Sequence, residues 1–380
     1  MRDILICFFD KYNGASIYAA INIRPKKIVF IGENKDNFLE EVDNISSYLS
    51  IRLPELLVER TILKERDYYE LRGIINEYPR GSTLINLSSG HRLITIMAYK
   101  LCLEEGYKSI FAEPEEDFLL DLSSEDIQPL KDIERDMSVR DLIAGAGGES
   151  LRDSSELFKD EKVKAMTEYI VKNYALWKKV KKLLRNNFYI EYSVDEPMKV
   201  KINIALIRNY SFYESFFQKG QELGLYRLEK EEGDYLILEF DDIRYKSFLF
   251  KTGTWLEAMV YNLISGLKQM DDVRGGVVFL WDREKERIKN EADVLATSNS
   301  KLIYISCKDT SHYDESTLNE LEVYGNKIGG ENTVKILAVT SIPIKSTIMQ
   351  RAEEMGIKVL VFEGDIGGFR QKLSKVLKID

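Results

Sequence analysis

Cysteine and histidine are scarce in this chain of 380 residues, which has three cysteines and two histidines. Cys7, Cys102 and Cys307 lie far apart in the sequence. They exclude the dense disulfide framework of a small secreted domain and suit the reducing cytosol, so we expect a cytoplasmic protein. His91 and His312 are too few to complete a Cys/His set around a structural zinc ion.

Long apolar runs are also missing. The longest, such as Ile4–Phe9 and Val277–Trp281, are far below the ~20 residues that a membrane-spanning helix needs. The first run is interrupted by Asp10 too early for a signal peptide, so it is predicted to be a strand. We therefore expect no membrane partner.

Basic residues are outnumbered, with 54 Lys and Arg against 63 Asp and Glu, a formal net charge of −9. This balance excludes a uniformly basic coat for nucleic acid, but it leaves room for a local site built around metal ions. The chain is 44% hydrophobic and 31% charged, which is typical of a folded protein with a core. Its length predicts two domains at the usual ~100–200 residues each.

Strand and helix patterns alternate over the first ~125 residues, which predicts an α/β fold with a parallel, doubly wound sheet. The strands expected there are Ile4–Phe9, Lys27–Gly32, Glu55–Glu59, Thr83–Leu87, Ser109–Ala112 and Phe118–Leu122. The helices expected between them include Asn13–Asn22, Asp36–Leu49, Arg66–Glu77 and Arg92–Glu105.

A glycine-rich segment, Ala144–Gly148, indicates a domain boundary. We therefore divide the chain into a first domain over 1–140, a mixed connecting module over 141–250 and a last α/β domain over 251–380. In the last domain the strands expected are Gly276–Trp281, Glu291–Ala296, Leu302–Cys307, Val334–Val339 and Val359–Glu363.

Acidic and basic side chains gather on successive elements of the last domain. Glu257 lies at a helix start, Glu291 and Asp293 lie on one strand, and Lys308 ends the next strand. Strand alternation puts Glu291 and Asp293 on one face and Ala292 with Val294 on the other. The same alternation puts Cys307 in the sheet interior, where it packs rather than reacts. Lys308 is then expected beside the carboxylates.

Cleavage of a phosphodiester requires such a set of groups. Carboxylates hold Mg²⁺ or Mn²⁺, which polarises the phosphate and lowers the pKa of a bound water. A lysine near that water stabilises the developing negative charge. We therefore assign catalysis to Glu257, Asp293 and Lys308, and metal binding to Glu257, Glu291 and Asp293.

This order resembles the PD-(D/E)XK nuclease superfamily, whose motif is a helix glutamate, a strand aspartate and an acid-X-Lys triplet on the next strand. Glu257, Asp293 and Ser306-Cys307-Lys308 match it in order and element type. Ser306 stands where the family usually has an acid, so either Glu291 supplies the missing charge or fewer metal ions are bound. The resemblance implies a restriction-endonuclease-like domain and metal-dependent cleavage of nucleic acid.

Two loops of the first domain follow strands at the place where open α/β sheets bind ligands. One begins at Asp10 and the other runs through Asn86 to a helix start. Small hydroxyl residues and glycine at a helix N-terminus leave backbone N–H groups free for an anion. The ligand-binding residues expected are Asp10, Tyr12, Asn13, Asn86, Ser88, Ser89, Gly90, His91 and Arg92. Neither a GxGxxG nor a P-loop motif is present, which argues against a dinucleotide cofactor or an NTPase.

The phrase Leu84–Leu93 resembles the signature of the CARF domain, a Rossmann-like sensor in CRISPR-linked proteins. Together with the C-terminal motif, it implies a CRISPR ancillary nuclease with an N-terminal CARF sensor. That resemblance further implies a homodimer that binds one cyclic oligoadenylate as allosteric activator, with cyclic tetra-adenylate as the expected ring. The substrate implied is single-stranded RNA or DNA, or duplex DNA that is nicked.

Other interpretations stay open at this level. Ser88 can simply cap a helix, His91 and His312 can be surface residues, and the basic run Lys178–Arg185 is either a solvated helix face or a contact for phosphates. A CARF-domain transcription regulator without catalysis would need a helix-turn-helix in the connecting module. A metal-independent ribonuclease would need a basic site with histidine or arginine pairs. Neither feature is visible in the sequence.

Overall fold

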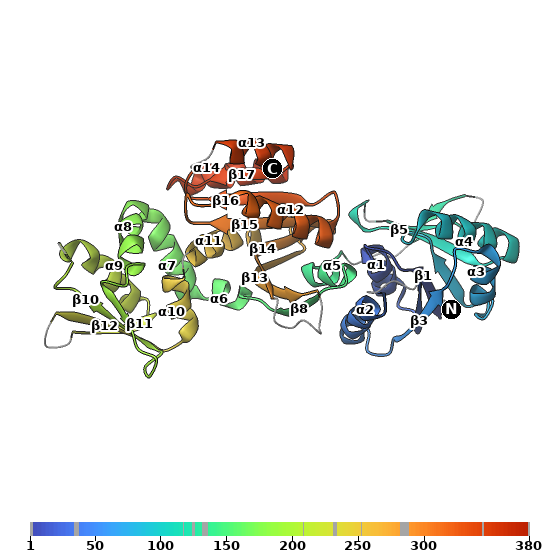
Figure 1. The fold of residues 1–380 in the computed structure, drawn as a ribbon, viewed down its shortest axis with the longest axis horizontal. Coiled ribbons are helices and arrows are strands. Elements are labelled where there is room, and N and C mark those ends of the chain that lie inside the picture. Colours follow the sequence, from blue (N-terminus) through green and yellow to red (C-terminus); the bar gives the residue numbers. More distant parts are fainter. Residues whose placement is uncertain are drawn as a thin grey trace.

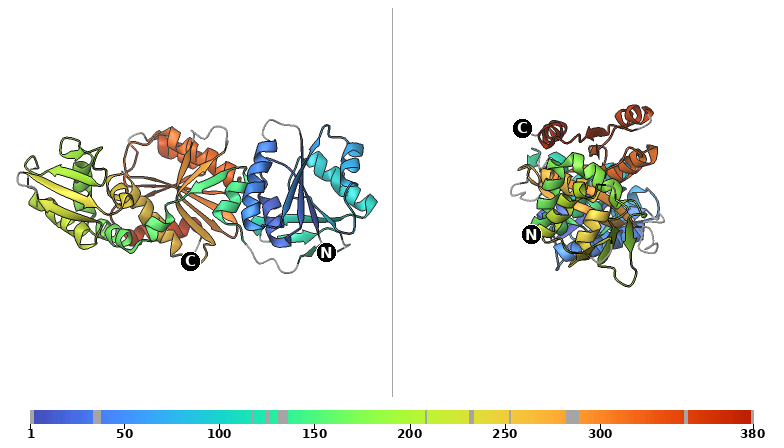
Figure 2. Two further views of the ribbon diagram at one scale, coloured as in Figure 1. Left: turned by 90° about the horizontal axis from the view of Figure 1, so that it is seen from below. Right: turned by 90° about the vertical axis from the view of Figure 1, so that its left-hand side faces the viewer.

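The structure of the protein is a computed structural model that describes residues 3–33, 38–116, 118–123, 126–130, 136–207, 209–230, 234–251, 253–281, 289–343 and 346–378. Three sheets with their helices follow one another along the longest axis, as Figures 1 and 2 show. The C-terminal sheet lies in the middle, between the N-terminal sheet and the sheet of the connecting module. In the part of the chain described, no helix is long and apolar enough to span a bilayer.

The N-terminal sheet has the order β3-β2-β1-β4-β5-β6-β7. Its strands are β1 (Ile4–Phe8), β2 (Lys27–Glu33), β3 (Leu57–Leu63), β4 (Thr83–Asn86), β5 (Lys108–Glu113), β6 (Phe118–Asp121) and β7 (Gln128–Pro129). Its helical elements are α1 (Gly14–Ile23), α2 (Phe38–Arg52), α3 (Tyr68–Ile75), α4 (Arg92–Glu105) and the 3₁₀ turn η1 (Pro114–Glu116). The first five strands in that order are parallel, and β6 and β7 are antiparallel additions.

Apolar side chains from both faces of this sheet are buried, which explains the continuous apolar run of β1. Leu5 and Cys7 pack with α1 and α2, whereas Ile6 and Phe8 pack with α3 and α4. The predicted doubly wound α/β fold is therefore confirmed. Strand β3 starts at Leu57 rather than at Glu55; this edge strand is largely exposed, so its apolar residues give a weak pattern.

The connecting module has its own antiparallel sheet, in the order β11-β12-β10-β9. Its strands are β9 (Ile190–Tyr192), β10 (Lys199–Asn203), β11 (Tyr226–Lys230) and β12 (Tyr235–Phe240), and its helices are α7 (Glu161–Lys172), α8 (Tyr174–Leu184), α9 (Ser211–Glu222) and α10 (Ile243–Phe250). Helix α7 starts at Asp160, whose carboxylate accepts from the backbone N–H groups of Lys162 and Val163.

The C-terminal sheet has the order β17-β16-β15-β14-β13-β8. Its strands are β8 (Glu149–Arg152), β13 (Asp272–Leu280), β14 (Asn290–Ser298), β15 (Lys301–Lys308), β16 (Val334–Val339) and β17 (Lys358–Val361). The helices around it are α5 (Val139–Gly145), α6 (Ser155–Lys159), α11 (Thr254–Ser265), α12 (Glu315–Gly329), α13 (Thr347–Glu354) and α14 (Ile366–Leu377).

Strands β13, β14 and β15 are antiparallel, and β15, β16 and β17 are parallel, so the sheet is mixed. Strand β8 lies inside the range 141–250 that we assigned to the connecting module, yet it pairs with β13 of the C-terminal sheet. Its four residues contain only one apolar side chain, Leu151, and gave no signal for that pairing. The domain limits themselves stay a prediction.

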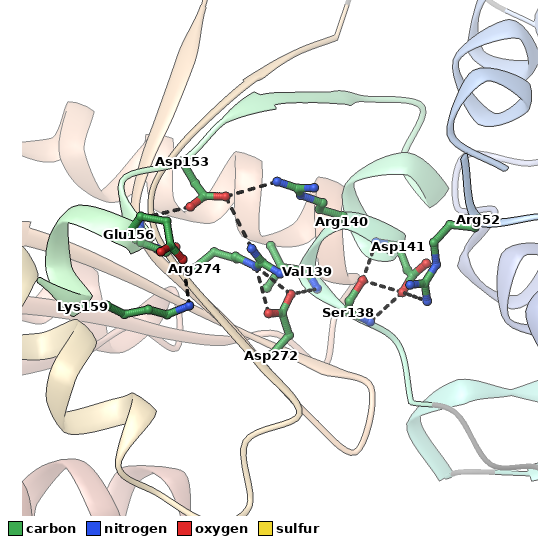
Figure 3. A network of polar contacts seen from close by, with 12 residues as sticks. Arg52, Ser138, Val139, Arg140, Asp141, Asp153, Glu156, Lys159, Asp272 and Arg274 are labelled. Carbon is green, nitrogen blue, oxygen red and sulfur yellow. Dashed lines mark hydrogen bonds and ion pairs between the residues drawn. The ribbon is translucent and has the colours of Figure 1, made fainter. Parts of the chain in front are cut away.

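Helix α5 joins the first sheet to the third through a chain of polar contacts (Figure 3). The buried carboxylate of Asp141 forms a capping box with Ser138 and lies 3.5 Å from the Arg52 guanidinium on α2. On the other side, the backbone N–H of Val139 donates to Asp272 Oδ2 at 3.2 Å. Asp272 in turn accepts from Arg274 of β13 at 2.9 Å. The helix is thus bonded to both domains and fixes their junction.

Candidate functional site

The three predicted catalytic side chains come from neighbouring elements of the C-terminal domain. Glu257 lies in the first turn of α11, which packs on β13, β14 and β15. Asp293 lies on β14 and Lys308 is the last residue of β15. Lys308 Nζ lies 3.6 Å from Asp293 Oδ2, so the strand-end lysine reaches the neighbouring strand as the sequence predicted.

Asp293 is held by the strand that carries Lys308. Its Oδ2 accepts from the backbone N–H of Cys307 at 2.6 Å and from Ser306 Oγ at 3.1 Å. The hairpin that sets this register turns at Asn299 and Ser300, whose φ angles of 47° and 59° suit a tight two-residue turn between twisted strands. Ser306, which departs from the nuclease motif, therefore orients Asp293.

Strand alternation fails beside Asp293, and this corrects the sequence prediction. Ala292 and Val294 were expected on one face, but Ala292 packs with the α12 side of the sheet and Val294 with the α11 side. The facing strand contains Gly276, whose positive φ of 55° introduces an irregularity at this point. The Asp293 carboxylate contacts β15 instead, at the end of the strand that carries Lys308.

Glu257 is half-buried at this edge. Burial, followed by repulsion from Asp293 and from the exposed Glu291, raises the pKa of Glu257 to about 8. Without a cation the carboxyl group is therefore largely protonated at neutral pH. A carboxylate with such a perturbed pKa, next to other acids, is typical of functional sites.

Burial lowers the pKa of Lys308, but attraction by Asp293 and other nearby acidic groups outweighs it, so the pKa is raised above its ordinary value. Lys308 therefore remains a cation. Cys307 points to the opposite, buried side, where burial and the adjacent acids raise the pKa of its thiol well above the usual range. A protonated, enclosed thiol is a poor nucleophile, in agreement with its predicted packing role.

Carboxylate oxygens are the ligands that Mg²⁺ and Mn²⁺ prefer. Within the described ranges, Glu257, Glu291 and Asp293 do not form a complete group of three metal-holding side chains. Glu257 and Asp293 nevertheless repel each other, and a divalent cation would remove that repulsion. The donor set therefore fits a metal held by two carboxylates, with water and substrate phosphate as the remaining ligands.

The raised pKa of Glu257 predicts a pH-dependent stability. Above its ordinary pKa of 4.5 the unfolded chain loses this proton, whereas the folded protein keeps it up to about 8. This group therefore lowers the free energy of unfolding progressively as the pH rises through that window. In a metal-free buffer, the melting temperature of the wild type should fall more steeply from about pH 5 to about pH 9 than that of Glu257→Gln. Parallel curves would contradict the assigned pKa.

A second candidate site is a cavity of about 1020 Å³ in the N-terminal domain. Its lining residues are Phe9, Asp10, Lys11, Gly32, Glu33, Phe38, Glu41, Gly90, His91, Arg92 and Ile94. Four of the nine predicted ligand residues are among them: Asp10, Gly90, His91 and Arg92. The cavity lies at the carboxyl ends of β1 and β2 and at the N-terminus of α4, where the switch-point rule placed it.

The loop before α4 is shaped by a close approach of backbone to side chain. Gly90 has a φ of 107°, and a Cβ atom there would lie 2.4 Å from the Cβ atom of Phe8, so only glycine fits. Nδ1 of His91 accepts the backbone N–H of Leu93 at 3.2 Å and caps α4. Its Nε2 lies 2.9 Å from the guanidinium of Arg66, which also binds Glu33.

The other predicted ligand residues lie outside this cavity. Asn13, Asn86 and Ser89 are buried and hydrogen-bonded to neighbouring residues: Asn13 to Asp10, Asn86 to Ser88, and Ser89 to Ser16 of α1. Tyr12 and Ser88 line a smaller hollow of about 360 Å³ shared with the C-terminal domain. The sequence signature therefore mixes pocket residues with residues that fold the loops.

Sequence reasoning missed three charged side chains of the cavity. Lys11 was inside a loop that we singled out, but its neighbours were chosen instead. Glu33 ends β2, and Glu41 comes from α2. No sequence motif marks either glutamate. An acidic residue on an amphipathic helix or at a strand end normally faces water, so its position gives no hint of a ligand site.

One stretch of the chain matches a described protein family, and the whole chain resembles solved structures in fold. Residues 245–378 match the family described as the Card1-like endonuclease domain. The chain also superposes on the crystal structure of protein VC1899 from Vibrio cholerae, with a TM-score of 0.73 and 19% identity over 99% of this chain and 98% of that one. Among curated proteins, none matches the sequence significantly.

Two further solved structures share the fold. Can2 from Sulfobacillus thermosulfidooxidans, solved in complex with cyclic tetra-adenylate, has a TM-score of 0.68 and 15% identity, with 99% of each chain covered. A type III CRISPR defence DNA nuclease activated by cyclic oligoadenylate has a TM-score of 0.51 and 15% identity. That match covers 99% of this chain and 51% of the other.

Proposed function

Residues 245–378 form a Card1-like endonuclease domain, and from this premise we propose that the protein is a metal-dependent nuclease switched on by a cyclic oligoadenylate in type III CRISPR defence. We expect cyclic tetra-adenylate as the ring and the cytoplasm as the place of action. The observation that carries the proposal is the juxtaposition of Lys308, Asp293 and the half-buried Glu257 at one edge of the nuclease sheet. The similarity to Can2 and to the CRISPR defence nuclease supports the sensor half.

The chemistry assigned to the chain's own residues follows from their surroundings. Glu257 and Asp293 would hold Mg²⁺ or Mn²⁺, which supplies a Lewis acid and an acidified water when bound. Asp293 keeps Oδ2 on the Cys307 amide and on Ser306, which leaves Oδ1 to face a cation. Lys308, kept charged by Asp293, would stabilise the negative charge that develops on the phosphate.

The direct test is cleavage of labelled RNA and DNA strands by the full chain with Mn²⁺, with and without cyclic tetra-adenylate. The proposal expects cleavage that depends on both the metal and the ring. Equal cleavage in a chelator would contradict the metal role, and equal cleavage without the ring would contradict the sensor role. Absence of cleavage of every nucleic acid offered would overturn the assignment as a nuclease.

A homodimer is part of the proposal, because an apolar stripe runs along the exposed side of α4. Leu93, Ile96, Tyr99 and Leu103 are 45%, 59%, 42% and 66% exposed. They recur at helical spacing, so they share one face. The same helix begins at the cavity, so a second copy packed on α4 would bring two cavities together around one ring-shaped ligand.

We expect Ile96→Glu combined with Leu103→Glu to convert the protein to a monomer, because charged groups cannot be buried unpaired in an apolar interface. Light scattering after gel filtration measures the mass directly. Ile243→Glu on α10 of the connecting module, which also replaces an exposed apolar residue, serves as the control and should remain dimeric. A wild-type mass near 44.0 kDa would contradict the homodimer.

Helix α12 offers a physical route from the sensor cavity to the nuclease site. Lys327 interacts electrostatically with Glu41 and Lys11 of the cavity, and its Nζ lies 3.8 Å from the Trp281 ring centroid. Glu320 lies on the same face of α12, and its charge helps to raise the pKa of Lys308. Positions 320 and 327 are seven residues apart, so they lie on one face about 10 Å apart along the axis.

Lys327→Met should therefore reduce activation by the ring while leaving ring-free activity unchanged. Couplings carried by a single residue are about 0.5–2 kcal/mol, so the fold-activation should fall roughly 2- to 30-fold. The measurement is the cleavage rate with and without cyclic tetra-adenylate. Lys375→Met on α14 is the matched control. An unchanged fold-activation in the Lys327 variant would mean that α12 does not transmit the signal.

A further inference from the structure

The basic run of the connecting module occupies the outer side of α8. Lys178, Lys179, Lys182 and Arg185 are exposed, whereas Trp177, Val180, Leu183 and Leu184 are buried on the other side. Among the described residues, no carboxylate lies within ion-pair distance of these four cations. On a chain with a formal charge of −9, this is a local concentration of unpaired positive charge.

These cations line a hollow of about 620 Å³ whose other wall belongs to the nuclease domain. That wall is the loop that follows β15, with Thr310, Ser311 and His312, together with Thr340 and Ser341 after β16. Only one acidic side chain, Asp309, is among the lining residues that the structure describes. Hydroxyl groups and lysines facing one another across a hollow are suited to phosphate oxygens.

Asp309 fixes the position of this hollow next to the nuclease site. Its buried carboxylate accepts from Lys181 Nζ at 2.6 Å and from Trp255 Nε1 at 2.7 Å. Lys181 is thereby neutralised, which leaves the exposed cations of α8 available. Asp309 follows Lys308 directly, and Trp255 precedes Glu257 by two residues. The hollow is therefore next to the predicted catalytic residues.

The basic surface continues on another side of α8. Lys179 and Lys182 also line a second hollow of about 400 Å³, which contains Tyr189 and Tyr213. Lys179 is held over the ring of Phe212, with its Nζ 4.2 Å from the centroid. Cations that follow a backbone, with aromatic rings beside them, are the recurring elements of surfaces that bind single strands.

We propose that α8 and the loop after Lys308 form the substrate-binding surface for a single nucleic-acid strand, with backbone phosphates on Lys178, Lys179, Lys182 and Arg185. This inference rests on the proposed nuclease function and assigns part of substrate binding to the connecting module. Strand binding then depends in part on a helix, α8, that lies outside the predicted nuclease domain.

The test is binding of a fluorescently labelled 20-nucleotide strand to the full chain in a chelator, measured by anisotropy over a range of salt concentrations. We expect Lys179→Glu combined with Lys182→Glu to weaken binding by about tenfold or more. The salt slope should fall by about 1.4, because two lysines that neutralise phosphates are replaced. In steady-state cleavage, the same variant should raise KM and leave kcat at saturation nearly unchanged.

The matched control is Lys372→Glu with Lys375→Glu on α14, which has the same spacing and charge change and also replaces exposed lysines. Equal loss in both variants would show a general charge effect and overturn the proposal. Unchanged binding and KM in the α8 variant, with a wild type that still cleaves, would reject this surface but not the nuclease. Tighter binding of the matching duplex than of the single strand would reject the single-strand path.

Discussion

Replacing Lys308 by alanine should lower the rate of nucleic-acid cleavage by two to three orders of magnitude. The Lys308 ammonium group lies 3.6 Å from Asp293 and stays charged because of it. Removing one preorganised donor to a developing negative charge costs about 3–4 kcal/mol of transition-state stabilisation. Single-turnover cleavage of a labelled strand, with the ring and Mn²⁺ saturating, measures the effect.

Ring binding should be unchanged in this variant, since the sensor cavity belongs to another domain. Lys358→Ala is the control, because it removes an exposed lysine from β17, in the same sheet. It should cleave at the wild-type rate. A Lys308→Ala rate within about tenfold of wild type, roughly 1.4 kcal/mol, would rule out the catalytic role.

Replacing Asp309 by alanine should lower the free energy of unfolding by about 3–5 kcal/mol, because a buried cation loses its charged partner. The Asp309 carboxylate is 1% exposed, and Lys181 is 16% exposed. Burial lowers the pKa of Lys181, and the ion pair with Asp309 offsets that effect. Loss of Asp309 therefore leaves the buried ammonium group without its charged partner. The Thr340 hydroxyl would lose its acceptor as well, now 2.7 Å away.

A shift of the urea midpoint, followed by tryptophan fluorescence, measures this loss, because Trp255 donates to Asp309 and Trp177 lies in the same cluster. Asp309→Asn keeps an acceptor for the indole and the hydroxyl, so its loss should be smaller. A change below about 1 kcal/mol in Asp309→Ala would mean that the contact is no more than a surface pair.

Several features of this protein could be predicted from the sequence because they depend on local periodicity. The continuous apolar runs in β1 and β16 indicate buried strands, and the period of 3.6 indicates the helix from Arg92 to Glu105. The order of Glu257, Asp293 and Lys308 on helix, strand and strand also needed only element boundaries. That order and the loop before α4 were sufficient to indicate a nuclease with a sensor domain.

Contacts between distant residues were decided only by the tertiary structure. The bend at Gly276 moved Ala292 to the other face, and β8 crossed from the connecting module into the nuclease sheet. Asp309 meets Lys181 across 128 positions of chain, and nothing local marks either residue. A pattern of polarity records which side chains are buried, but it does not record which partner buries them. That choice depends on the packing of whole elements, and it creates both the edge that holds Glu257 and the basic surface of α8.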